Sequence, residues 1–416
     1  MNSRQKKLTL KRRFAEKRFR YYGLASLFLA TTMLFIIIFS MMYRAVPAFT
    51  NYGMNLEINL PISESEDSDS QDLNYRRIIN KSILSLAPDC MDRSCIRDLV
   101  RLFSSGASYD LREYIEKNSS YTNETFSLFI LFSDDADLFY KFGIDEDLEE
   151  EERRLDDREV RWLQEFQKTG KVESRISKNM FLNGDSREPE IAGVLGAVIG
   201  SLYTILITLL ISFPIGVFTA IYLENFAAKS RITDFIEVNI NNLAAVPSII
   251  FGLLGLALFI NFFGMPRSAP LVGGCVLSLM TLPTIIISTR ASLQAVPPSI
   301  REAALAMGAS EMQVVFHHLL PASLPGILTG TIIGLARAFG ESAPLLLIGM
   351  VAFIVDIPGS ITDPATALPV QVYIWADSPE RAFVAKTSAA TLVLILLLVI
   401  INLAAVIMRK RYELKW

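Results

Sequence analysis

Histidine is almost absent from this sequence: only two of its 416 residues are histidine, the adjacent His317 and His318. A multi-histidine metal site or a Ser-His-Asp triad therefore has almost nothing to draw on, which disfavours a zinc enzyme and a conventional hydrolase. We expect no metal site in the chain and expect both histidines at its surface. The chain also lacks the Gly-x-x-x-x-Gly-Lys-Ser/Thr pattern that cradles the phosphates of ATP.

Charged residues are scarce in the second half of the chain. Residues 191–408 contain 10 of the 43 acidic and 8 of the 40 basic residues, whereas residues 44–190 contain 31 acidic and 19 basic ones. The net charge of −3 hides this division and gives no indication of nucleic-acid binding. The sequence predicts one part in lipid and one part in water.

Six apolar stretches are long enough to cross a bilayer, which takes about 20 residues of helix. They are residues 24–42, 191–223, 240–262, 268–289, 327–354 and 387–408. Residues 1–20 hold nine Lys and Arg against a single Glu, so we expect a cytoplasmic N-terminus. Six crossings return the C-terminus, with its basic run 409–411, to the same side. A cleaved signal peptide is the alternative interpretation of the first stretch.

This pattern predicts an all-α polytopic membrane protein with six transmembrane helices and a small α-rich external domain. The expected parts are a basic tail (1–22), a first span (23–43), an external domain (44–190), a core of five spans (191–408) with a cytoplasmic loop (290–326), and a second tail (409–416).

The expected external domain mixes helical and strand patterns. Helical spacing of apolar residues predicts helices over 76–86, 96–103 and 146–167, and residues 126–132 are typical of a short buried strand. Residues 63–70 are acidic and serine-rich, and we expect them to be disordered. We find no catalytic constellation in this domain.

Cysteine is rare as well, with three residues in the chain. Cys90 and Cys95 lie close together in the expected external domain, where thiols oxidise, so we expect a local disulfide; two free thiols are the alternative. Cys275 falls in an apolar stretch, and we expect it to serve as a small apolar residue.

The cytoplasmic loop 290–326 carries the most informative motif. Pro297 and Pro298 end any preceding helix, Ser299 is expected to cap a new one with Glu302 three residues on, and Gly308 to end or bend it. The sequence therefore predicts a short helix along the membrane surface, whose small residues allow another protein to approach closely.

This loop resembles the EAA loop of binding-protein-dependent ABC importers. The matching residues are Glu302, Ala303, Ala304, Gly308 and the later Leu320-Pro321. The resemblance implies a coupling helix that docks in a groove of an ATPase subunit and transmits its closure to the membrane helices.

The next span contains two charges, Arg337 and Glu341, at a spacing that places them on one helix face. A charge deep in the bilayer costs several kcal/mol unless it is paired or hydrated. One interpretation is an ion pair that only stabilises packing. The other is that Arg337 faces a translocation path and binds a tetrahedral oxyanion while Glu341 weakens its hold. Pro344 is expected to kink the helix.

A glycine stripe precedes this pair in the same span. Gly326, Gly330 and Gly334 repeat every four residues, which permits close contact with a neighbouring helix. We interpret this stripe as a packing surface.

The run from Ala336 to Leu346, with Phe213-Pro214, Val246-Pro247 and Leu282-Pro283, resembles phosphate-importer permeases of the PstA type over about residues 191–408. The resemblance implies that Arg337, Glu341 and the adjoining Ser342 lie along a phosphate path. Some relatives have a further arginine at the position that matches Ile287. Arg290, three residues later, is the nearest basic residue here, so the resemblance implies only weakly that it contacts the substrate. The resemblance gives the external domain no function.

By the same resemblance the chain is a non-catalytic subunit of the bacterial inner membrane that holds no cofactor. Its implied partners are a homologous permease (PstC type), an ATPase dimer that uses ATP (PstB type) and a periplasmic phosphate-binding protein (PstS type). The competing hypotheses are a permease for another oxyanion or small solute, an ion-coupled secondary carrier with Glu341 as the titrating group, and a membrane-anchored sensor.

Overall fold

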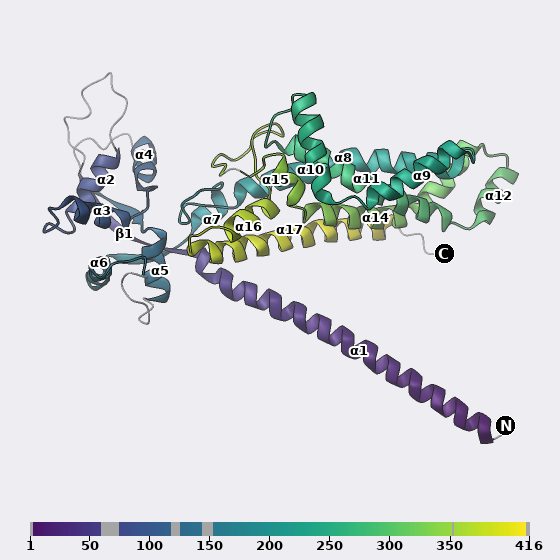
Figure 1. The fold of residues 1–416 in the computed structure, drawn as a ribbon, viewed down its shortest axis with the longest axis horizontal. Helices are drawn as coiled ribbons and strands as arrows, with labels where there is room; N and C mark the ends of the chain where they lie inside the picture. The colour runs from purple at the N-terminus through teal and green to yellow at the C-terminus, as the bar shows by residue number, and fades with distance from the viewer. Residues whose placement is uncertain (1–2, 60–74, 118–124, 144–152, 352, 413–416) are drawn as a thin grey trace.

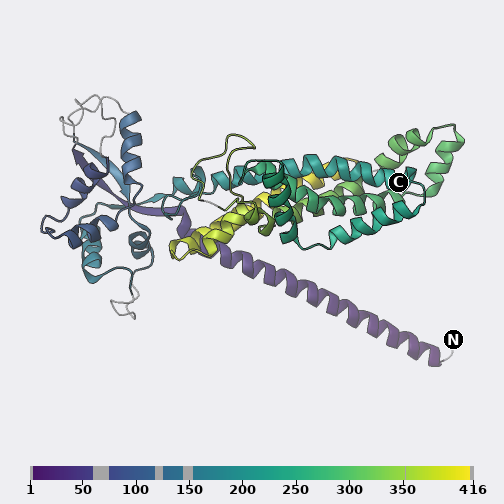
Figure 2. The same cartoon turned by 45° about the horizontal axis from the view of Figure 1, so that its top comes forward.

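The structure, a computed structural model, describes residues 3–59, 75–117, 125–143, 153–351 and 353–412. The chain forms an elongated molecule with a small sheet-containing domain at one end, a helical bundle beside it, and a long N-terminal helix that diverges from the bundle (Figures 1 and 2). The predicted disordered run 63–70 lies outside the described residues.

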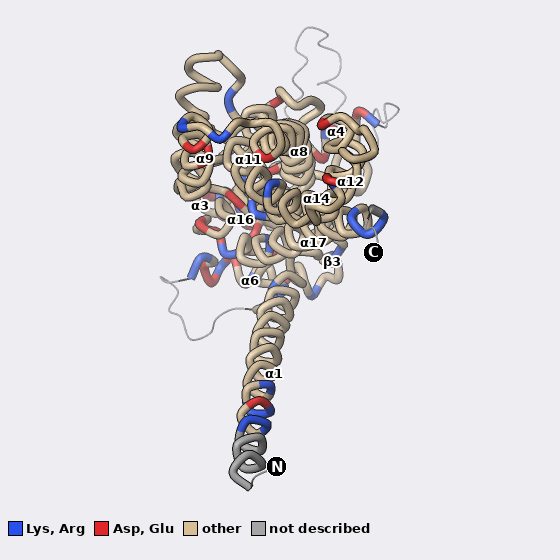
Figure 3. The backbone as a smooth tube through the Cα atoms, turned by 90° about the vertical axis from the view of Figure 1, so that its right-hand side faces the viewer, with Lys and Arg blue, Asp and Glu red and all other residues tan. Residues whose placement is uncertain are grey.

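The N-terminal helix α1 (Ser3–Ala45) contains the first predicted span. Its apolar side chains from Leu24 to Tyr43 are largely exposed, as expected for a helix that faces lipid. Figure 3 shows that the described charges of α1 gather toward its N-terminal end, while the rest of the helix is uncharged up to Arg44. A 3₁₀ turn, η1 (Val46–Phe49), then leads directly into strand β1 (Thr50–Asn59).

The sheet domain is defined here as the described residues from Thr50 to Ile176. Its antiparallel sheet has the order β2-β1-β3, with β2 at Thr125–Leu131 and β3 at Val172–Ile176. Helices α2 (Tyr75–Leu84), α3 (Arg93–Arg101), α4 (Ala107–Lys117), α5 (Asp134–Phe142) and α6 (Asp157–Lys168) surround it. Leucine, isoleucine and phenylalanine side chains from β1, β2 and these helices form one core.

The domain is α-rich as predicted, but it is organised around a sheet of which the sequence indicated only β2. The predicted helix 146–167 is too long: α6 begins at Asp157, because Asp156 caps it and Glu159 completes a capping box. Residues 146–152 of that prediction lie outside the described residues.

The bundle begins after the short helix α7 (Lys178–Leu182). It comprises α8 (Leu195–Ile221), continued by the π-helical turn η4 (Tyr222–Phe226), α9 (Arg231–Ala244), α10 (Ser248–Gly255), the π-helix η5 (Leu256–Phe262) and α11 (Pro270–Gln294). It continues with α12 (Pro298–Ala306), α13 (Glu311–Gln313), the π-helix η6 (Val314–Leu319), α14 (Leu320–Phe339), α15 (Ala343–Leu347), α16 (Leu368–Ala376) and α17 (Ala382–Tyr412).

Among the described residues, five helices are long and apolar enough to cross a membrane, or six if one bent pair counts as a span. The bent pair is α9 with α10 and η5, which meet at an angle of 102°. The predicted span 240–262 is therefore interrupted by a sharp bend. Pro247 has no amide hydrogen to donate and disfavours helix at the residue before it, so the chain turns there.

The predicted span 327–354 is also interrupted. Helix α14 ends at Phe339, with Gly340 as its C-cap, and Pro344 lies in the first turn of the separate helix α15. The expected kink at Pro344 is thus a complete break placed four residues earlier. A proline is well tolerated in the first turn of a helix, since no amide hydrogen is needed there.

Candidate functional site

The break between α14 and α15 carries the two charged residues of the predicted path. Arg337 lies in the last turn of α14, and Glu341 follows the helix end. The Arg337 Nε atom is 3.8 Å from Glu341 Oε1, which is an ion-pair contact longer than a hydrogen bond. The Arg337 side chain is 57% exposed and that of Glu341 23%. The guanidinium is therefore held by one carboxylate and presented on an outer face of the bundle.

Arg337 lies inside the apolar layer that α17 crosses. The side chain of Arg409, at the end of the apolar part of α17, donates to Thr329 Oγ1 at 3.3 Å. Arg337 is eight residues further along α14 than Thr329, which corresponds to about 12 Å at 1.5 Å per residue. Ile333, one turn before Arg337, is also exposed, so this face of α14 is uncovered in the single chain.

The glycine stripe of α14 packs on α11. A Cβ atom at Gly330 would lie 2.2 Å from Ser288 Cβ, and one at Gly326 would lie 2.8 Å from Ser292 Cβ. These two glycines therefore let the helices approach closely, as the packing interpretation predicts. At Gly334 the nearest atom, in Thr284, would be 3.6 Å away, an ordinary contact.

Ser342 stands at the N-cap of α15, beside Glu341. Its backbone carbonyl accepts the hydrogen bond from Leu346 N at 2.9 Å, while its side chain makes no capping hydrogen bond. The hydroxyl is half-buried at the break. Ser342 thus directly follows Glu341 at the break between α14 and α15.

Arg290 lies elsewhere, in an ion-pair network that joins three helical segments. Its Nε is 3.3 Å from Glu224 Oε2 and its Nη2 is 2.9 Å from Glu237 Oε1. Gln294 also donates to Glu224 Oε2, at 2.9 Å. These bonds connect α11 to η4 and to α9. Contact of Arg290 with a substrate stays a prediction, and the structure gives this side chain a second role in positioning helices.

The predicted surface helix is α12. It begins at Pro298, with Pro297 rather than Ser299 at its N-cap, because a proline fits the first helical position. Gly308 ends it with φ +86°, in the left-handed region where glycine is favoured. The expectation that Ser299 caps the helix is therefore wrong, while the expected helix end is confirmed.

One face of α12 is buried and the other is open. Ala304 packs against η6, and Arg301 holds Glu311 at 2.9 Å, so the helix is fixed to the start of the next span. Glu302 and Ala303 are exposed. Sequence reasoning missed Met307, whose side chain is 89% exposed at the end of the helix. His317 and His318 are exposed in η6, as expected.

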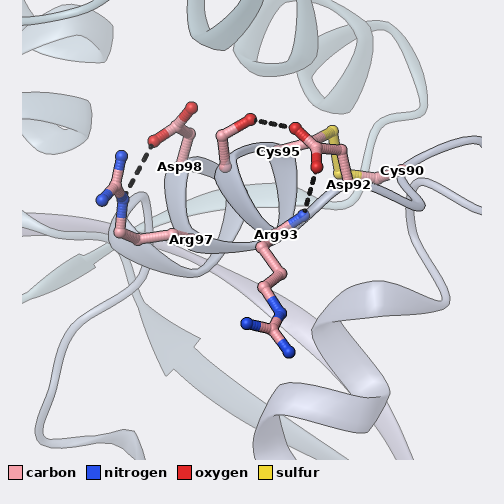
Figure 4. The surroundings of a disulfide bond; sticks show 7 residues. Cys90, Asp92, Arg93, Cys95, Arg97 and Asp98 are labelled. Carbon is pink, nitrogen blue, oxygen red and sulfur yellow. Dashed lines mark hydrogen bonds and ion pairs between the residues drawn. A yellow bond between two sulfur atoms is a disulfide. The ribbon is translucent and has the colours of Figure 1, made fainter.

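A disulfide joins Cys90 and Cys95 at the start of α3, with their Cα atoms 5.7 Å apart (Figure 4). Asp92, between them, is the N-cap and accepts hydrogen bonds from Arg93 N and Ser94 Oγ. These hydrogen bonds, that of Ser94 above all, lower the pKa of Asp92. Cys275 is free and half-buried in α11.

A group of buried charges lies where the sheet domain meets the bundle. Lys386, at the start of α17, is 4% exposed and donates to the carbonyl of Ala192 at 2.6 Å. Asp137 and Lys141 of α5 form an ion pair at 2.5 Å. Glu190 is 4% exposed, and burial raises its pKa to about 7. Sequence reasoning missed this group. The available signal was Lys386 at the start of an apolar stretch, because a lysine in such a place needs a charged or polar partner.

Asp185 belongs to the same junction. Its carboxylate accepts a hydrogen bond from Trp375 Nε1 at 2.8 Å, and burial raises its pKa to about 6. This bond ties the segment before α8 to α16. Among the described residues, no group of three or more His, Cys, Asp or Glu side chains could hold a metal ion.

Two family models match the chain. Residues 212–414 match the binding-protein-dependent transport system inner membrane component, and residues 6–150 match a domain of unknown function (DUF3333). The probable ABC transporter permease protein YqgI of Bacillus subtilis is 32% identical over 230 residues, covering 51% of this chain and 76% of that protein. The phosphate transport system permease protein PstA of Mycobacterium leprae is 34% identical over 225 residues, covering 53% and 72%.

A PstA protein of Haemophilus influenzae is 32% identical over 204 residues, covering 49% of this chain and 71% of that protein. Among solved structures, an inward-facing form of the MetNI methionine ABC transporter aligns with 53% of this chain and 94% of its own, at 20% identity and a TM-score of 0.40.

Proposed function

We propose that this chain, which belongs to the family of binding-protein-dependent ABC transporter permeases, forms the translocation path of a phosphate importer together with a second, homologous permease (PstC type). The relatives named as phosphate permeases support this substrate, and so does the chemistry of the α14 face. In this role the chain is a non-catalytic membrane subunit.

The observation that carries the proposal is the exposed guanidinium of Arg337 inside the apolar layer. An exposed arginine at that depth is costly unless a partner, water or an anion meets it. Its planar fork of N–H donors matches a tetrahedral oxyanion. Glu341, at 3.8 Å, weakens the hold on the anion by competing for the same charge, which allows release.

The uncovered face around Ile333 and Arg337 is where the second permease packs in this proposal. The path then runs along the seam between the two subunits. Ser342, at the break beside Glu341, adds a hydroxyl that can donate to a phosphate oxygen.

Coupling to ATP runs through α12. An ATPase dimer (PstB type), which binds and hydrolyses the ATP, docks on the exposed Glu302 and Ala303. The buried Ala304 passes its motion to η6. From Glu311 to Phe339 the chain is one continuous helix of 29 residues. A displacement of α12 is therefore transmitted along this rod to Arg337, which changes access between the two sides of the membrane.

The proposed topology places both termini and α12 in the cytoplasm. The sheet domain then lies in the periplasm, where the Cys90–Cys95 disulfide persists. A periplasmic phosphate-binding protein (PstS type) delivers the substrate at that end of the bundle.

The test is ATP-dependent uptake of radiolabelled phosphate into vesicles that contain the complete transporter. Replacing Arg337 by Ala removes charge-assisted hydrogen bonds of about 1.5–3 kcal/mol, so uptake falls about 10-fold to 100-fold. Arg337→Lys retains part of the activity, and Arg231→Ala, an exposed arginine at the start of α9, leaves it unchanged.

Undiminished uptake by Arg337→Ala would contradict the anion role. Stronger inhibition of uptake by sulfate or another oxyanion than by unlabelled phosphate would point to a different substrate. Uptake driven by an ion gradient in vesicles without the ATPase would favour the secondary carrier.

A further inference from the structure

A cavity of about 860 Å³ lies where the sheet domain meets the ends of two membrane helices. Its walls come from the C-terminal end of α1, from α5 and α6, and from the start of α17. It is separate from the Arg337 face and from α12, and the transport mechanism does not use it.

The cavity combines an apolar lining with positive charge. Leu138, Phe139 and Phe142 of α5 and Val384 of α17 provide apolar walls. Of the residues that the structure describes, four arginines, at positions 44, 153, 154 and 381, and one acidic residue, Asp135, line the cavity. Such a combination fits an amphipathic anion better than a small inorganic one.

The four arginines are not equivalent. Arg153 pairs with Asp157 at 3.2 Å, and Arg154 lies 3.6 Å from Asp135 and donates to the carbonyl of Pro379. Arg44 and Arg381 are exposed, and the residues that the structure describes include no ion-pair partner for either. The two guanidinium groups that remain to meet an anion thus stand at the ends of α1 and α17.

The cavity also lies beside two candidate membrane helices. Both α1 and α17 are candidate membrane spans, and Arg44 and Arg381 follow or precede their apolar parts, at the level of lipid headgroups. Helix α1 diverges from the bundle beyond this point (Figures 1 and 2). Both helices carry exposed apolar side chains, such as Phe39 of α1 and Leu396 of α17.

We propose that this cavity binds an anionic phospholipid. The phosphate of the headgroup lies between Arg44 and Arg381, and the acyl chains extend along the apolar walls beside α1 and α17. A lipid bound there joins α1, the sheet domain and α17 into one unit. This site is independent of the phosphate path.

The experiment uses the full chain in nanodiscs or mild detergent, with native mass spectrometry to count bound lipids. The probes are phosphatidylglycerol and phosphatidylcholine of equal chain length. Each basic residue near a headgroup contributes about 1 kcal/mol, so Arg44→Gln/Arg381→Gln should weaken phosphatidylglycerol binding about 10-fold to 30-fold. Arg44→Lys/Arg381→Lys should restore most of it.

The matched control is Arg93→Gln/Arg161→Gln, which removes the same charge from exposed positions that do not line the cavity. Its lipid binding should equal that of the unmodified protein. Equal retention of phosphatidylglycerol by the Arg44/Arg381 double variant, or equal binding of both lipids by the unmodified protein, would overturn the proposal. Displacement of the lipid by millimolar inorganic phosphate would instead identify a free-phosphate site.

A fourth variant tests whether an acidic segment of this chain, rather than a lipid, pairs with the arginines of the cavity. Residues 144–152, outside the described residues, join two lining positions and contain seven acidic side chains. If lipid binds only after these are changed to Asn and Gln, the acidic segment is the natural counter-charge and the lipid proposal is wrong. A protein that binds phosphatidylglycerol with these residues intact supports it.

Discussion

Replacing Gly330 by alanine should force α14 and α11 apart. The new Cβ atom would lie 2.2 Å from Ser288 Cβ, well inside the contact distance of two carbon atoms. Rotation of the serine hydroxyl cannot relieve this clash, because Cβ is fixed to the backbone. Overpacking of this kind costs about 1–3 kcal/mol, and we expect the upper part of that range.

Gly334 provides the matched control, because it belongs to the same stripe. Its added Cβ would meet Thr284 at 3.6 Å without strain, and alanine is about 0.5–1 kcal/mol better than glycine inside a helix. Gly334→Ala should therefore leave stability unchanged or raise it slightly. Comparing Gly330→Ala with Gly334→Ala therefore distinguishes a specific steric clash at Gly330 from a general intolerance of alanine in the glycine stripe.

The assay is thermal unfolding of the purified chain in mild detergent, with phosphate uptake as a second measurement. Ser288→Gly should rescue Gly330→Ala, since it removes the atom that is struck. A Gly330→Ala variant that unfolds at the same temperature as Gly334→Ala, or a clash that Ser288→Gly does not relieve, would refute the close packing of these helices.

Three further predictions concern other parts of the molecule. Burial raises the pKa of Glu190 from 4.5 to about 7, so between these pH values the folded chain binds a proton there that the unfolded chain releases. The free energy of unfolding should therefore fall by at most about 3 kcal/mol as the pH rises from about 4.5 to 7. Glu190→Gln should flatten this pH dependence when unfolding is measured between pH 5 and 8. Met307→Asp should reduce co-purification of the ATPase without changing the unfolding temperature, whereas Met312→Asp, on the exposed side of α13, should not. Cys95→Ser should destabilise the sheet domain by about 2 kcal/mol through loss of a short closed loop, seen in its resistance to proteolysis; equal resistance would contradict this.

The sequence predicted the membrane helices well where apolar runs were uninterrupted. Helices α1 and α17 contain two of the predicted spans, and α8 and α11 cover most of two others, because length and hydropathy alone decide whether a helix can cross a bilayer. Length and hydropathy did not predict the breaks at Pro247 and Gly340. At both residues a local backbone preference ends the helix although the apolar run continues in the sequence.

The candidate site was predictable only in part. The four-residue spacing of Arg337 and Glu341 correctly predicted an ion pair, although Glu341 lies beyond the end of α14 and not on its helical face. The partners of Arg290 were not predictable, because Glu224 and Glu237 are 66 and 53 residues away in the sequence. Nor were the junction charges, which come from α5, the segment before α8 and the start of α17, and are brought together only by the fold.

The direct passage from α1 into β1 has a mechanical consequence. Only the four residues of η1 separate a membrane helix from the central strand of the sheet, so no slack tether lies between them. A change in the tilt of α1 therefore moves the whole sheet domain with it. A force applied to the sheet domain is transmitted in turn to the lipid-facing helix α1. The rigid connection therefore couples the position of the domain to the tilt of this helix.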